Sequence, residues 1–185
     1  MSESDPSGIR DAVRKVRELM IDVSSLLKEA QGIMMRAGWR QRSNDGMALL
    51  GGGFSLNTAH KWIPYGAFVF FGREGAETLI PCISVLLDQE SEGEILTEPL
   101  VSGLVLRFQE SNELPKGPAL YSAADFHLHA PGRTDDGRVI RYSRQLNGKA
   151  ACTVNIESFA VPLMDIKGRA DVEQRIADPL LDIVR

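Results

Sequence analysis

The sequence predicts an α+β fold in which a long N-terminal helix packs on an antiparallel sheet of five or six strands, followed by a short C-terminal helix. Two patterns support this prediction. Apolar residues recur in steps of four and three over residues 1–38, as they do along one face of a helix. From residue 65 onward the chain instead consists of β-branched and aromatic runs that turn residues separate from one another.

The chain has 185 residues, of which 43% are hydrophobic and 25% charged, as is typical of a globular protein. This length fits one domain over residues 1–185. The formal net charge of −4 disfavours a general binder of nucleic acid or of anionic membranes. No apolar run reaches about 18 residues and the start lacks the features of a signal peptide, so we expect a cytoplasmic protein without a membrane segment.

The predicted N-terminal helix carries two adjacent apolar rows. Asp5 and Pro6 suit its N-cap and first turn, and Gly38 suits a left-handed C-terminal cap. The main row consists of Ile9, Val13, Val16, Met20, Val23, Leu27, Ala30, Met34 and Ala37. The second row consists of Ala12, Leu19, Leu26 and Ile33. Because two rows need a broad surface or two neighbours, we expect one row on the chain's own sheet and the other on the C-terminal helix or a second subunit.

Residues 39–64 are predicted to form an irregular connection with a short strand over Met47–Leu50. Gly51–Gly53 indicates a loop, since it lacks the lysine and the strand–loop–helix context of a phosphate-binding loop. Trp39 and Trp62 have two interpretations. They close the two ends of the core, which we favour, or they contribute to an interface, for which Trp62 is the candidate.

Six strand-like runs are bounded by turn signals, of which Asn147-Gly148 is a strong indication of a hairpin. The runs are Tyr65–Arg73, Thr78–Asp88, Glu98–Phe108, Ala119–Ala130, Arg138–Leu146 and Ala150–Val161. The links between them are too short for helical crossovers, so neighbouring strands are expected to be antiparallel.

The first three runs are apolar on both alternating faces, which predicts central strands that are covered on both sides. Pro81, within the second run, indicates a bulge or a sheet edge at that point. Cys82 and Cys152 lie in apolar runs, and we expect them to be reduced, structural thiols. A disulfide between the two remains the alternative.

The tail over Arg169–Arg185 returns to helical spacing through Val172, Ile176, Leu180 and Ile183. Asp178-Pro179 is predicted to start a second short helix within it, because proline fits the first turn of a helix. The expected order is therefore helix, sheet, helix within one domain.

One group of residues has the composition of a metal site. On a strand Asp125, His127 and His129 would share a face, and two imidazoles with a carboxylate are a ligand set for zinc, iron or manganese. The alternative, which we favour, is an exposed polar face with Phe126 and Leu128 turned into the core. No cofactor is expected under this interpretation.

A second group is basic. Arg138, Arg141 and Arg144, with Arg133 and Lys149 nearby, could hold a phosphate group. The alternative is a solvated face that is balanced by the acidic segment over residues 88–98.

These patterns favour a non-enzymatic protein-interaction module of the adaptor, chaperone or sensor kind. We expect it to bind a protein partner, above all a second copy of itself, because the apolar faces exceed what one short C-terminal helix can cover. The interface candidates are Ala12, Leu19, Leu26, Ile33 and Trp62. The alternative is a metal-dependent hydrolase or nuclease that uses Asp125, His127 and His129, with the arginines holding phosphate.

Overall fold

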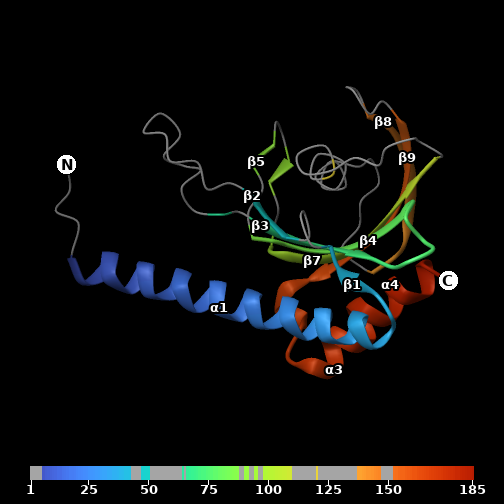
Figure 1. The fold of residues 1–185 in the computed structure, drawn as a ribbon. Coiled ribbons are helices and arrows are strands. Elements are labelled where there is room, and N and C mark those ends of the chain that lie inside the picture. Colours follow the sequence, from blue (N-terminus) through green and yellow to red (C-terminus); the bar gives the residue numbers. More distant parts are fainter. Residues whose placement is uncertain are drawn as a thin grey trace.

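The computed structural model describes residues 6–42, 47–50, 64, 66–87, 90–91, 94–95, 98–109, 120, 137–146 and 152–185. It contains a twisted antiparallel sheet with helices against one of its faces (Figure 1). The predicted α+β architecture, with its long N-terminal helix and short C-terminal helix, is confirmed.

Helix α1 runs over Pro6–Arg36. It ends as the glycine after its apolar rows predicts: Gly38 has a φ of 85°, and its amide donates to the carbonyl oxygen of Met35. The amide of Trp39 donates to the carbonyl oxygen of Met34, so two of the last carbonyl groups of the helix are bonded. Gly38 thereby turns the chain into the first strand.

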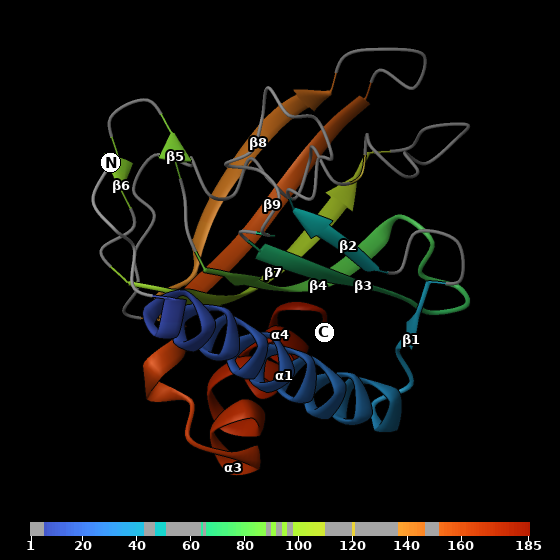
Figure 2. The ribbon, with the colours of Figure 1, turned by 90° about the vertical axis from the view of Figure 1, so that its left-hand side faces the viewer.

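The main sheet has seven strands in six positions, because β1 and β2 share one edge of β3. All of the described pairings are antiparallel. In sheet order β3, β4, β7, β9 and β8 lie side by side, while β1 and β2 both pair with the outer edge of β3 (Figure 2). The strands are β1 (Arg40–Gln41), β2 (Met47–Leu50), β3 (Gly66–Gly72), β4 (Leu79–Leu86), β7 (Leu100–Phe108), β8 (Ile140–Leu146) and β9 (Cys152–Pro162). Five of the six predicted strand runs, and the short strand at 47–50, are thus confirmed.

The described residues add one element to the predicted strand list, and one predicted strand lies almost wholly outside them. A two-stranded ribbon of β5 (Glu90–Ser91) and β6 (Glu94–Ile95) lies where the sequence indicates only a turn. Of the predicted strand Ala119–Ala130 only Leu120 is described, and its backbone is helical.

The central position of β3, β4 and β7 is confirmed. Six of the seven residues of β3 and seven of the eight residues of β4 are buried, so both faces of these strands are covered. Of the two possibilities at Pro81, a bulge or a sheet edge, the bulge is wrong, because Pro81 pairs with Val105 of β7 in regular register, and Pro81 lies instead where the β3–β4 ladder ends. The pairing of β4 with β3 ends at Cys82, one residue away. The missing N–H of Pro81 therefore removes no hydrogen bond between β3 and β4.

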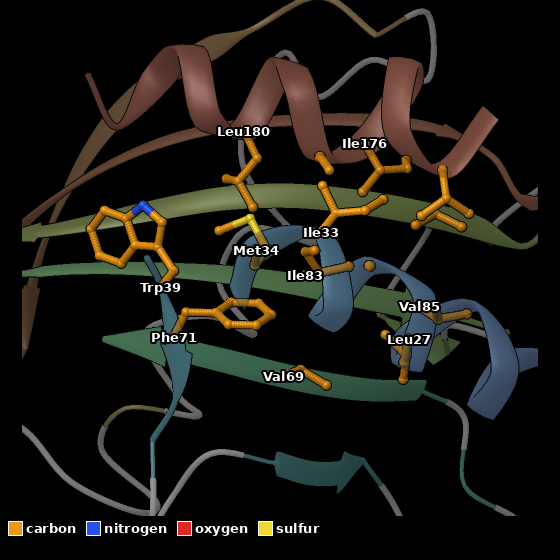
Figure 3. Packing of buried hydrophobic residues seen from close by; sticks show 14 of the residues in the cluster. Leu27, Ile33, Met34, Trp39, Val69, Phe71, Ile83, Val85, Ile176 and Leu180 are labelled. Atoms are coloured by element: carbon orange, nitrogen blue, oxygen red, sulfur yellow. The ribbon is translucent and has the colours of Figure 1, made fainter. Parts of the chain in front are cut away.

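Two hydrophobic clusters lie on the two faces of the sheet. One joins the second half of α1 and the C-terminal helices to the sheet, and it contains Met34, Trp39, Phe71, Ile83 and Leu180 (Figure 3). Trp39 is buried there beneath the guanidinium group of Arg73, which confirms its core role. The other cluster includes Phe68, Phe70 and Leu104, which are fully buried.

The C-terminal helical segment follows the 3-10 turn η3 (Leu163–Asp165) and consists of α3 (Arg169–Val172), the π-helical turn η4 (Glu173–Ala177) and α4 (Asp178–Ile183). Asp178 keeps helical dihedral angles, so the predicted second helix continues the first without a break. Pro179 cannot donate to the preceding turn, and the wider π turn stands directly before it.

Candidate interaction surface

Solvent exposure changes abruptly along the main apolar row of α1. Val13 is 48% exposed and Val16 37%, whereas Val23 is 3% exposed and Met34 fully buried. The residues keep the same helical spacing throughout, so they face the same side of the helix. One continuous apolar row is therefore covered in its second half and open in its first.

The cover stops because α1 is longer than the elements that it packs against. Figure 1 shows its N-terminal part extending past the edge of the sheet. Within the described part of the chain, α1 contacts β1, β3, β4, α3 and η4, and its buried residues lie in its second half. An exposed apolar row of this kind is a candidate interaction surface.

A groove with a volume of about 570 Å³ lies between α1 and the segment that leads into α3. Leu19 belongs both to the open part of the second row and to the groove, where Leu26 follows it. The other wall is formed by residues 163–169, and its Met164 is 63% exposed. We call the open row together with this groove the α1 surface.

Charged side chains border the groove. Arg169 lies 3.1 Å from Glu29 across it, joining α3 to α1, and the Lys167 ammonium group donates to the carbonyl oxygen of Met164. Both groups of the Arg169–Glu29 pair are partly exposed, so it contributes little to stability.

The structure divides the five interface candidates. Ala12 is exposed and Leu19 is 37% exposed, so both are open to a second molecule. Leu26 is partly buried at the edge of the core, and Ile33 is buried within the protein's own core. Trp62 lies outside the described residues. The helix is therefore divided along its length, rather than into one row for the sheet and one for a second molecule.

The three candidate metal ligands, Asp125, His127 and His129, lie outside the described residues, as does Gly51–Gly53. Among the residues that the structure does describe, no group of three histidine, cysteine or acidic side chains could hold a metal ion.

The arginine candidates do not share one face. Arg141 alternates with Tyr142 and Arg144 along β8, so Arg141 and Arg144 point to opposite sides of the sheet. Arg138 precedes the strand and is exposed. The Arg141 Nε donates to Glu157 Oε1 at 2.6 Å, which places a carboxylate directly beside this arginine.

Glu157 lies between two arginines on adjacent strands. Arg107 Nε donates to its Oε2 at 2.9 Å, while a second Arg107 nitrogen donates to the carbonyl oxygen of Ile183 at the end of α4. Burial alone would raise the pKa of Glu157, but the hydrogen bonds and charges of Arg141 and Arg107 outweigh it and lower the pKa. Arg107, Glu157 and Arg141 together join β7, β9 and β8 to the end of α4. Sequence spacing did not predict this group.

Both cysteines are free and buried in the cluster opposite the helices, which confirms reduced, structural thiols. Burial raises the pKa of Cys82 and of Cys152, so both thiols are poor nucleophiles. Burial likewise raises the pKa of the nearby Tyr142, and its interaction with Ser158 opposes that shift.

Sequence reasoning did not find the second wall of the groove. Met164 and Lys167 stand in a short turn without periodicity, and only their packing beside α1 reveals a role. No helix in the described part of the chain combines the length and apolar character needed to span a membrane. No protein-family model, curated protein or solved structure matches this chain, so its own residues supply the functional argument.

Proposed function

We propose that this protein is a non-enzymatic interaction module that self-associates through the α1 surface. The observation that supports this proposal most directly is the loss of cover along one apolar row, from Met34 at 0% exposure to Val13 at 48%. Large connected apolar patches on a folded protein are typical of interaction sites.

The spacing of the open row favours a helical partner. Val13, Val16 and Met20 continue the alternation of three and four residues that packs α1 onto its own core. Side chains with this spacing interdigitate with those of a second helix that has the same repeat. A second copy of the chain carries a helix with the same repeat. We therefore propose the protein itself as the partner.

Sedimentation velocity at micromolar concentration tests this proposal. The wild type is expected to sediment as a dimer. Val16→Glu, which places a charge on the open row, is expected to sediment as a monomer that keeps the cooperative unfolding of the wild type. Ile21→Glu is the matched control, because Ile21 is 64% exposed and faces away from the row. A wild type that remains monomeric, or a Val16→Glu variant that still dimerises, would contradict the proposal.

A further inference from the structure

We infer, independently of the self-association proposed above, that Arg107 of the sheet caps the C-terminal end of α4 and that Glu157 positions its guanidinium group for this role. The last carbonyl groups of a helix have no partner within it, and the negative end of the helix dipole lies there. The carbonyl oxygen of Ile183, at the end of α4, accepts a hydrogen bond from the Arg107 side chain, which lies 76 residues earlier on β7.

The sequence of α4 supplies no positive charge for this end. Its residues, DPLLDI, include no basic side chain, and Arg185 just beyond them pairs with Asp182. Basic residues near the end of a helix commonly bond its last carbonyl groups. Arg107 therefore makes, from the sheet, the contact that a basic residue in the last turn would make.

Arg107 reaches α4 because β7 carries it on the side of the sheet that faces the helices. Val101 and Val105 share this side, and both are buried in the cluster that also contains Leu180 of α4. Arg107 follows them at the end of the row, and β7 and α4 are in contact. The apolar part of the row thus packs beneath the helix, while the charged group lies at its end.

Glu157 fixes the direction of the Arg107 side chain. It pairs with Val105 across β7 and β9, so it lies diagonally beside Arg107. Its Oε2 accepts from Arg107 Nε at 2.9 Å, and a different nitrogen of Arg107 donates to Ile183. Because the guanidinium group is planar and its donors have a fixed geometry, holding Nε also directs the other nitrogens. The Glu157 side chain is only 16% exposed, which limits competition from water.

The turn that Arg107 holds covers part of the core. Leu180 is fully buried and Val184 is buried, and the Val184 amide donates to the carbonyl oxygen of Leu180. Opening of this turn would break that hydrogen bond and expose both side chains. Local opening of this kind costs less free energy than global unfolding. The Arg107 cap should therefore control how often the end of α4 opens while the rest of the protein stays folded.

Residue-resolved amide hydrogen exchange of the full chain, measured by NMR, tests this inference. Arg107→Met keeps the apolar stem of the side chain and removes its donors. It is expected to speed exchange of the Val184 amide roughly three- to tenfold, because a hydrogen bond from a partly exposed charged group contributes modestly. The Val172 amide, which donates to Gly168 at the other end of the same helical segment, is expected to keep its rate. Glu157→Ala should also speed exchange at Val184, by no more than Arg107→Met does.

Arg141→Gln is the matched control, because Arg141 donates to the other oxygen of the same carboxylate from β8. It is expected to leave exchange at Val184 unchanged. An unchanged Val184 rate in Arg107→Met overturns the cap, and so does equal acceleration at Val172 and Val184, since the effect would then be global. If Glu157→Ala has no effect, or if Arg141→Gln acts as strongly, the positioning role of Glu157 is overturned.

Discussion

The ring of Phe159 occupies the space in which a side chain at Gly103 would begin. The two residues pair across β7 and β9, and a Cβ built on Gly103 would lie 2.5 Å from the ring atom Cζ. Phe159 is 1% exposed within the cluster beneath α1, so the glycine allows the aromatic ring to lie flat on the sheet.

Gly103→Ala is therefore expected to destabilise the protein by about 1–3 kcal/mol, the usual cost of overpacking a core. Urea denaturation measures the change. Gly103→Ala combined with Phe159→Leu should lose less stability than the two single changes together, because the smaller side chain vacates the contested space. Additive effects would show that the two residues do not compete.

Ser84 and Ser102 form a hydrogen bond of 2.7 Å between their hydroxyl groups, and both residues are fully buried among apolar side chains. Ser84→Ala is expected to cost about 1–3 kcal/mol, because it leaves the Ser102 hydroxyl without this bond in an apolar environment. The double variant with Ser102→Ala should cost little more than either single change. A double-variant cycle by chemical denaturation measures this coupling, and a coupling near zero would refute it.

The free energy of unfolding should depend on pH through Glu157. Its pKa in the folded protein is lower than the ordinary value of 4.5, so the unfolded chain binds the proton more readily. The stabilisation is thus complete above the unfolded-state pKa and is lost as pH falls through the folded-state pKa.

We expect Glu157→Gln to cost about 1–2 kcal/mol at neutral pH, because the amide keeps one neutral acceptor, turns an NH2 donor toward the second arginine and removes the charge from both interactions. The difference from wild type should shrink below pH 4.5 as the wild-type carboxylate takes up its proton. Asp182→Asn, which removes an exposed pair with Arg185, is the control and should change little at any pH. A difference that stays constant into acid would contradict this role of Glu157.

The two thiols should resist modification while the protein is folded. Burial raises the pKa of Cys82 and of Cys152, so little thiolate forms at neutral pH, and reagent access is blocked as well. A colorimetric thiol reagent is expected to label neither residue rapidly under native conditions and both in denaturant. Fast labelling of one thiol in the native protein would show that its cover opens readily.

Metal analysis tests the alternative interpretation of Asp125, His127 and His129. An interaction module is expected to contain no stoichiometric zinc, iron or manganese after purification, and its melting temperature should not change on dialysis against a chelator. Stoichiometric metal that His127→Ala with His129→Ala removes would instead support the metal-dependent hydrolase or nuclease.

The candidate surface could be predicted only in part. Ala12 and Leu19 emerged from the second apolar row, because helical spacing shows which residues share a side. Ile33 belongs to the same row but is buried in the core of the protein. The position of the sheet causes this difference, and the spacing of the row does not predict it. The groove wall near Met164 has no local signal, since it exists only where a turn packs beside α1.

The sequence by itself determined the elements whose causes are local. The spacing of apolar residues and Gly38 defined α1, and β-branched and aromatic runs bounded by turn residues located β3, β4, β7, β8 and β9. The tertiary structure alone decided that β9 lies between β7 and β8, and that cover on α1 ends at Val23. These features depend on contacts between residues far apart in the chain and on the length of the helix relative to the sheet, and no local pattern carries that information.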